Sequence, residues 1–323
     1  MKKDSTDFDS LLADLTATIQ KTSRIDDQLW QKYHVKRGLR NEDHSGVLVG
    51  LTNIGNVVGY HREDGKIIPC DGELYYRGYN IHHIVEGFQK DGRHGFEETV
   101  FLLLSGRLPM KPVLDRFTDL LATQRELDPA IKMSILEFKG VDIMNVLART
   151  VMVMYARDLE ADVITHVNLI VKSIKINARC PTIISEAYQS MQNYYRNKTL
   201  YIGHPRREFS MAESFLYMLK VEGNYTKLDT DVLDLALVLH SEHGGGNNST
   251  FTVRVISSSN TDTYSAITAG IGSLKGPLHG GANLRVNHMF DHFKKVIKNW
   301  DSDDEIKNYM LKVLKKEAYD RTG

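Results

Sequence analysis

The stretch YSAITAGIGSLKGPLHGGAN, residues 264–283, joins a helical pattern to a histidine flanked by glycines. Large apolar residues recur at the helical spacing i, i+3, i+7 and i+10 from Tyr264, and small residues between them let another helix approach closely. His279 follows, with Pro277 before it and two glycines after it, so a bare backbone can present the imidazole to a bound molecule. An ordinary tight turn has the same sequence signature, so the rest of the chain has to decide between the two.

The same helical periodicity recurs on both sides of this stretch. It predicts helices at residues 96–104, 141–156, 163–178, 211–220, 231–239 and 286–297. Ser302 and Glu305 predict a capping box for a last helix that ends near Ala318. Residues 56–77 differ, because short β-type runs flank Asp64-Gly65 and predict a hairpin. We therefore expect an all-α, multi-helical protein with one small antiparallel β element near residues 56–77.

The composition is that of a globular protein with a full core. Among 323 residues, 41% are hydrophobic and 25% are charged. Lysine plus arginine equals aspartate plus glutamate at 41 each, so the net charge of zero predicts no nucleic-acid partner. No apolar run approaches the ~18 residues of a membrane span, and the N-terminus shows no secretory signal. The two cysteines, Cys70 and Cys180, are expected to be small buried residues in a cytoplasmic protein.

A second histidine stretch, LHSEHGGGNNS at residues 239–249, ends a predicted buried helix and runs into three glycines. The N–H groups of the glycine backbone, together with the side chains of Asn247 and Ser249, suit a small and highly polar anion. His243, if protonated, would add charge and a directional donor to a carboxylate. His240 is expected to cap the preceding helix, because a donor suits its C-terminal carbonyl groups.

His279 has a different electrostatic setting. It lies just before a predicted helix that begins near Asn283, so it is close to the positive end of the helix dipole. That position disfavours an imidazolium and favours a neutral ring that donates a hydrogen bond. A neutral donor of this kind can stabilise a carbonyl oxygen that gains negative charge in a transition state.

Other interpretations of these residues are open at this point. The glycine-rich stretch can be a flexible loop, and His279 can be a turn histidine. His240, His243 and His279 could form a three-histidine metal site, but no nearby Asp or Cys completes it, and we expect no bound metal. Two glycine-flanked histidines joined by a helix of small residues are nevertheless more specific together than either is alone.

These residues carry a family resemblance. HSEHGGGNNSTFTVRVISSS followed by AGIGSLKGPLHGGAN resembles the citrate synthase family, and so do ELYYRGYNI at 73–81, FEETVFLLLSGRLP at 96–109 and ESFLYML at 213–219. The resemblance spans most of the chain from about residue 45 onward. It implies a nearly all-helical fold with a large and a small domain, a homodimer, and the condensation of acetyl-CoA with oxaloacetate to citrate and CoA. No cofactor is implied, since acetyl-CoA is a substrate.

The resemblance also implies roles for four residues. His279 would donate a hydrogen bond to the thioester carbonyl and stabilise the enolate, and His243 would hold oxaloacetate. Asn247 and Ser249 would lie near the substrate, with Ser249 orienting His279. The implied domains are a helical arm at residues 1–45, a large helical domain at 46–280, and at 281–323 a dimer helix with the truncated start of the small domain.

This sequence departs from the family pattern at its C-terminal end. In the family a Gly-His-Ala-Val type motif follows the segment similar to KKEAYDRTG, residues 315–323, with which this sequence ends. We therefore expect a fragment without the third histidine, the aspartate base and the carboxylate-binding arginines, and hence without turnover. Two alternatives stay open: 2-methylcitrate synthase, which uses propionyl-CoA, and a non-catalytic helical homologue that binds a partner or a small anion.

Overall fold

The computed structural model describes residues 51–64 and 66–319, together with residues 13, 15–20, 26–34, 39, 41, 46 and 47. Its contacts divide the chain into two units, Met1–Val49 and Gly50–Gly323. In the first unit, helix α2 spans Asp27–Lys32, and most of the predicted N-terminal arm lies outside the described residues. The predicted boundary near residue 280 stays a prediction.

A small antiparallel sheet begins the second unit. Strand β1 spans Gly55–Glu63, β2 spans Lys66–Tyr76, and the short β3 spans Tyr79–Asn80, in the order β1-β2-β3. The register pairs Gly55 with Tyr76 at one end of the hairpin and Glu63 with Lys66 at the other. The small β element predicted near residues 56–77 is thus confirmed.

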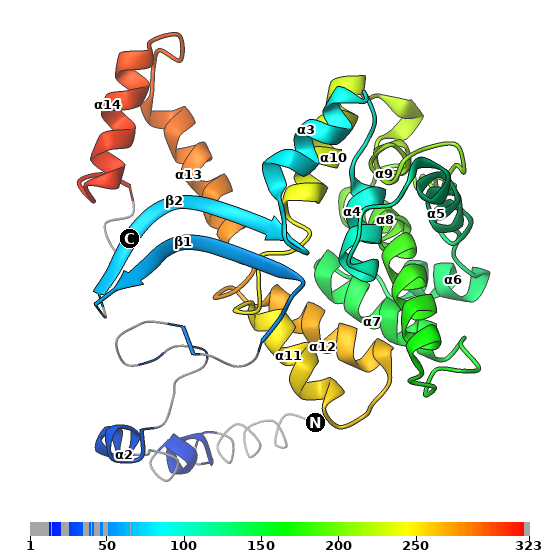
Figure 1. Ribbon diagram of the computed structural model, residues 1–323, viewed down its shortest axis with the longest axis horizontal. Coiled ribbons are helices and arrows are strands. Elements are labelled where there is room, and N and C mark those ends of the chain that lie inside the picture. Colours follow the sequence, from blue (N-terminus) through cyan, green and yellow to red (C-terminus); the bar gives the residue numbers. More distant parts are fainter. Residues whose placement is uncertain are drawn as a thin grey trace, which may run out of the picture. The chain divides into compact units, whose positions relative to one another are not determined.

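Helices form the rest of the second unit, as Figure 1 shows. In chain order they are α3 (Ile81–Lys90), α4 (Phe96–Ser105), α5 (Lys111–Thr123), α6 (Pro129–Glu137), α7 (Ile143–Tyr155), α8 (His166–Arg196), α9 (Met211–Leu219), the 3₁₀ turn η1 (Val221–Gly223), α10 (Lys227–Leu239), α11 (Asn248–Ser257), α12 (Thr263–Lys275), α13 (Ala282–Val296) and α14 (Asp303–Leu314). The all-α prediction is confirmed.

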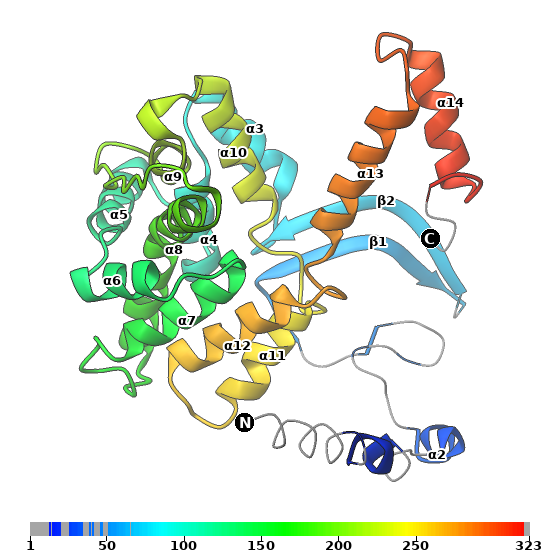
Figure 2. The ribbon, with the colours of Figure 1, turned by 180° about the vertical axis from the view of Figure 1, so that it is seen from behind.

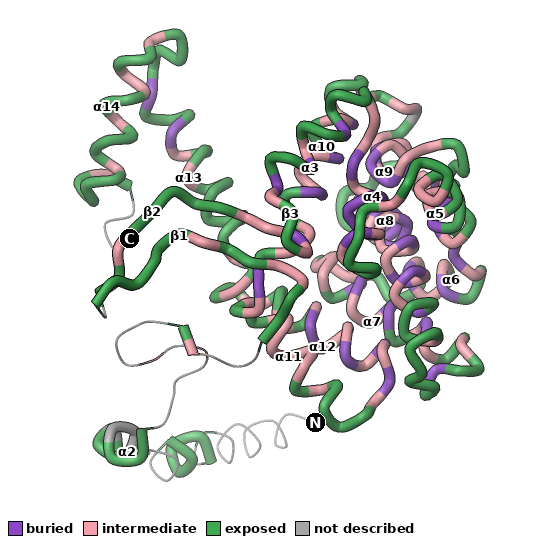
Figure 3. Tube along the Cα trace, in the orientation of Figure 1, coloured by how far each residue is buried: buried purple, intermediate pink, exposed green. Residues whose placement is uncertain are grey.

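Helix α8 is the centre of the packing. It contacts α5, α6, α7 and α9, while α7 packs against α12 and α12 packs against α11 (Figures 1 and 2). The largest apolar cluster joins α6, α7, α8 and α12 through residues such as Ile131, Val151, Ile183 and Tyr264, each at most 2% exposed. Figure 3 shows that the buried positions gather on these helices, whereas the hairpin, α13 and α14 are mostly exposed.

Three local predictions from the sequence are wrong. Helix α8 does not end near residue 178 but continues through Pro181 to Arg196, because its second half packs into the core despite the proline. The capping box at Ser302 is only half formed, since the Glu305 carboxylate accepts a hydrogen bond from Lys298 N at 2.9 Å instead, and α14 ends at Leu314. Cys70 lies exposed on β2.

The other cysteine, Cys180, packs against the largest apolar cluster, and burial raises the pKa of its thiol to about 11. Within the part of the chain that the structure describes, no helix combines the length and apolar character that a membrane span requires.

Candidate active site

The first turn of α11 connects the two histidine stretches. Asn247 is the N-cap of α11, where its Oδ1 accepts a hydrogen bond from Thr250 N at 3.0 Å, and its Nδ2 lies 2.7 Å from His243 Nε2. Ser249, two residues further on, places its Oγ 2.9 Å from His279 Nε2. The structure therefore brings the four site residues predicted from the sequence together around one helix N-terminus.

The Asn247 contact determines the proton position on His243. The Thr250 N–H can only donate, so the amide oxygen of Asn247 faces it and the amide NH₂ faces the imidazole. Since that NH₂ is a donor, His243 Nε2 accepts and carries no proton. This contact fits a neutral His243 with its proton on Nδ1, which leaves one N–H for an oxygen of a ligand.

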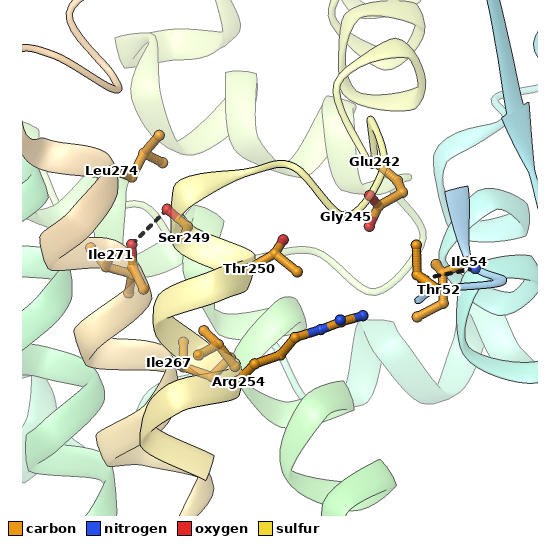
Figure 4. Close-up of a pocket in the computed structure, with 12 residues that line it drawn as sticks. Thr52, Ile54, Glu242, Gly245, Ser249, Thr250, Arg254, Ile267, Ile271 and Leu274 are labelled. Atoms are coloured by element: carbon orange, nitrogen blue, oxygen red, sulfur yellow. Dashed lines mark hydrogen bonds between the residues drawn. The ribbon is translucent and has the colours of Figure 1, made fainter. Parts of the chain in front are cut away.

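The Ser249 contact leaves two proton arrangements for His279. The single hydroxyl proton of Ser249 has two neighbours, Gly270 O at 2.9 Å and His279 Nε2 at 2.9 Å. The bond to Gly270 is the dashed line at Ser249 in Figure 4. If the proton goes to Gly270, His279 must donate from Nε2. If it goes to Nε2, a neutral His279 carries its own proton on Nδ1 and can donate it elsewhere.

A tight turn fixes the backbone at His279. Gly276 O accepts hydrogen bonds from His279 N at 3.0 Å and from Gly280 N at 2.9 Å. A Cβ on Gly280 would lie 2.0 Å from Leu274 O, so this position accepts no side chain. Helix α13 begins at Ala282, which places His279 just before a helix N-terminus, as the sequence predicts.

Glu242 alters the expected anion site at the other histidine. Its Oε1 accepts hydrogen bonds from His243 N at 3.0 Å and Gly244 N at 2.7 Å, and Gly244 has φ +92°. Two backbone donors that the sequence assigns to an external anion are therefore already bound to a carboxylate of the chain itself. His240 behaves as predicted, because it is the C-cap of α10 and its Nδ1 lies 2.7 Å from Ala236 O.

A cavity of about 470 Å³ lies between α11, α12 and residues 52–54 (Figure 4). Apolar side chains such as Ile54, Ile267 and Ile271 line it, and Arg254 and Glu242 are its charged groups. Ser249 belongs both to the cavity wall and to the contact with His279, so a group bound here would lie next to the histidine site. No motif in the sequence selects Arg254, which donates to Leu51 O at 3.2 Å.

Among the residues that the structure describes, no group of three or more His, Cys, Asp or Glu side chains is arranged to hold a metal ion. The same residues offer no carboxylate to either imidazole ring: the ring of His243 contacts Asn247 and that of His279 contacts Ser249. Within the described residues, the site therefore presents two imidazole rings, each held at its Nε2 by a side chain from the start of α11.

Fold and site together define a mostly helical protein in which two histidine loops meet at the N-terminus of one helix. Residues 43–322 match the family model described as citrate synthase, C-terminal domain. The chain belongs to the citrate synthase family, whose members are acyltransferases.

Named relatives include both citrate and 2-methylcitrate synthases. The citrate synthase of Haloferax volcanii is 37% identical over 261 residues, which are 79% of this chain and 61% of that enzyme. The 2-methylcitrate synthase 2 of Corynebacterium glutamicum is 34% identical over 237 residues, which are 72% of this chain and 58% of that enzyme. The chain thus spans about three fifths of the length of these relatives.

A solved structure has a similar fold. Citrate synthase from Thermoplasma acidophilum, in a ternary complex with carboxymethyl coenzyme A and oxaloacetate, superposes with a TM-score of 0.65 at 25% sequence identity. The superposed part covers 78% of this chain and 59% of that one.

Proposed function

We propose that this chain supplies the His243 and His279 part of a citrate synthase active site, which condenses acetyl-CoA with oxaloacetate to citrate and CoA. One observation carries the proposal: both histidines are attached to the first turn of α11, His243 through Asn247 and His279 through Ser249. Because the chain belongs to the citrate synthase family, we propose oxaloacetate and acetyl-CoA as the substrates to which these two imidazoles donate.

His243 is the proposed oxaloacetate ligand. Its neutral ring has its proton on Nδ1, and that N–H donates to an oxygen of the bound keto acid. Asn247 keeps the ring in this tautomer by donating to Nε2, and its own amide is fixed because it caps α11. The imidazole is thereby held as a donor before any substrate arrives.

His279 is the proposed donor to the thioester. Its neutral ring donates from Nδ1 to the carbonyl oxygen of acetyl-CoA, which becomes negative when the methyl group loses a proton. This tautomer is the one in which the Ser249 hydroxyl donates to Nε2 rather than to Gly270 O. The enolate carbon then attacks the keto carbon of oxaloacetate to form the new C–C bond, and hydrolysis of the thioester releases CoA.

The methyl proton needs a base, and neither imidazole contacts a carboxylate among the described residues. We therefore expect this chain not to turn over, so thiol release from acetyl-CoA and oxaloacetate should stay at the uncatalysed level. Rapid turnover would contradict this expectation and would show that the base that takes the methyl proton belongs to this chain.

We further propose that the chain forms a homodimer and functions in the cytoplasm. Helix α13 supports a homodimer, because Leu284, Val286 and Phe290 are 60%, 43% and 47% exposed. Cys70 and Cys180 are free thiols, which suits a reducing compartment. Sedimentation of the chain as a strict monomer would contradict the dimer.

Calorimetric titration with oxaloacetate tests the proposed function. The chain should bind oxaloacetate, His243→Ala should lose that binding, and His279→Ala should keep it. In the complete enzyme, His279→Ala should lower kcat by roughly 10²–10³-fold, the usual effect of removing an oxyanion-type donor. An unchanged kcat would exclude His279 from the chemistry.

A second candidate function is 2-methylcitrate synthesis from propionyl-CoA, favoured by the relative in Corynebacterium glutamicum at 34% identity. One methylene is worth only ~1–3 kcal/mol in an apolar pocket, so the two substrates differ by a measurable but modest factor. Thiol release from acetyl-CoA and from propionyl-CoA, compared as kcat/KM in the complete enzyme, separates the two functions.

A further inference from the structure

Tyr76 connects the small sheet to the loop that carries His243. The residue ends β2, and it is fully buried at 0% exposure. Its hydroxyl lies 2.8 Å from Val238 O and 3.1 Å from Leu239 O, at the C-terminal end of α10, where Val238 O also accepts from Ser241 N at 3.3 Å. The same oxygen accepts a hydrogen bond from Glu242 N at 3.3 Å. One phenol thus connects the end of α10 with the residue before His243.

The partner of Tyr76 across the hairpin contacts the same loop. Gly55 pairs with Tyr76 in the β1–β2 register, and Glu242 packs so closely on Gly55 that a Cβ there would lie 2.4 Å from Glu242 Cγ. The carboxylate of Glu242 then accepts from His243 N and Gly244 N. A single pair of opposed residues in the sheet therefore holds Glu242 through both its main chain and its side chain.

We propose that Tyr76 is a positioning residue for His243, which it holds at its distance from Asn247 by fixing Glu242 between the end of α10 and the β1–β2 hairpin. The effect on substrate binding rests on the proposed function, in which His243 is the oxaloacetate ligand. The effect on the His243 ring does not, because it follows from the contacts alone.

The ring and the hydroxyl of Tyr76 have separable roles. The ring packs in an apolar cluster with Ile81, Ile84 and Phe88, so its removal would destabilise the fold. The hydroxyl alone reaches the His243 loop. Burial raises the pKa of Tyr76, so the phenol keeps its proton and donates at neutral pH. Tyr76→Phe therefore removes the proposed function of the residue and preserves its packing.

The test is long-range ¹H–¹⁵N correlation of the histidine rings in the full chain. In Tyr76→Phe, the Nε2 signal of His243 should move away from that of a hydrogen-bonded acceptor, while the signals of His279 stay in place. Affinity for oxaloacetate should fall about tenfold, as expected when buried donors and acceptors lose a partner. A His243→Gln spectrum assigns the signal.

Tyr264→Phe is the matched control. Tyr264 is also a buried tyrosine, 2% exposed, and its hydroxyl donates to Asp158 at 2.7 Å in a different cluster. This variant should leave the His243 signal unchanged. If Tyr76→Phe also leaves it unchanged, Tyr76 has only a structural role and the proposal is wrong. If the parent chain binds no oxaloacetate, the proposed function fails, and the ring signal still decides whether Tyr76 positions His243.

A second variant decides the question if Tyr76→Phe does not fold. Gly55→Ala leaves the phenol in place but forces Glu242 away from the strand, because the new Cβ and Glu242 Cγ cannot both fit. It should shift the same His243 signal. An unchanged signal in folded Gly55→Ala would overturn the proposal.

Discussion

Helices α8 and α11 hold their places by different means. Helix α8 lies in the core and buries apolar residues such as Ile183 and Ala187. Helix α11, which joins both histidines, has no fully buried residue. It is held by the Asn247 cap, by the Ser249 contacts, and by the close approach of Val253 to Gly270, where a Cβ would lie 2.8 Å from Val253 Cγ2.

The difference separates stability from site geometry. Around α8, the stabilising free energy comes from buried apolar area, which tolerates small shifts in side-chain position. Around α11, directed hydrogen bonds and close contacts at glycine hold the helix in place. Substitutions near α8 should therefore change the free energy of unfolding, and substitutions near α11 should change the two imidazoles more than they change stability.

The largest expected effect comes from Ile183→Ala on α8. Ile183 is 0% exposed in the largest cluster, so truncation should lower the free energy of unfolding by ~2–5 kcal/mol. Urea titration followed by circular dichroism measures the change. Val255→Ala on α11 is the matched control, since Val255 is 51% exposed and should cost less than ~0.5 kcal/mol. Equal losses at the two positions would show that α11 belongs to the same packed core.

The same contrast explains what the sequence could predict. Apolar periodicity identifies a helix whose large side chains pack on a neighbour, as those of α12 do at Tyr264, Ile267 and Ile271. It failed in the second half of α8, which buries polar residues such as Glu186 and Gln192 and contains Pro181. Such a segment has the pattern of an exposed or broken helix, although its neighbours enclose it.

At the site, local sequence identified the histidines, because glycines flank both of them. Asn247 contacts a histidine close to it in the sequence, and Ser249 contacts the histidine of the other motif. Tyr76 and Glu242 lie 166 residues apart, and their contact depends on how the hairpin meets α10. No local pattern encodes such a pairing, so neither residue could be assigned a role before the structure was known.

The second-largest expected effect on stability is a pH dependence that arises from Glu186 on α8. The side chain is 2% exposed, neither carboxylate oxygen has a hydrogen-bond partner among the described residues, and Lys132 Nζ is 3.9 Å away. Burial raises the pKa of Glu186 to about 7, against an ordinary value of 4.5, although Lys132 opposes the shift and Glu126 adds to it. The folded chain therefore holds a proton on Glu186 at a pH where the unfolded chain has lost it.

The sign of the pH dependence follows from this difference in the pKa of Glu186 between the folded and the unfolded chain. The contribution of Glu186 to stability is fully present below about pH 4.5 and is lost as pH rises through about 7. The loss is on the order of 3 kcal/mol, from about 2.5 pKa units at 1.36 kcal/mol per unit. Glu186→Gln should remove this dependence and make the chain more stable than the parent at pH 8. Urea midpoints at pH 5, 6, 7 and 8 measure it, and parallel pH curves for the two proteins would contradict it.

The smallest effect on stability, and the sharpest test of the contrast, is at Asn247. Asn247→Ala removes the cap of α11 and should cost ~1 kcal/mol of unfolding free energy. Asn247→Asp keeps the cap, because a carboxylate oxygen accepts from Thr250 N as the amide oxygen does. Its stability should lie within ~0.5 kcal/mol of the parent.

The two variants should nevertheless differ strongly at His243. An aspartate at 247 turns an acceptor toward Nε2 in place of the amide donor, so the ring should carry a proton on Nε2. Ring ¹⁵N spectra at neutral pH should show protonated Nε2 in Asn247→Asp, unprotonated Nε2 in the parent, and no defined hydrogen bond in Asn247→Ala. If Nε2 of the parent already carries a proton, the amide does not fix the tautomer. Helix α11 would then hold the imidazole in place without selecting which of its nitrogens donates.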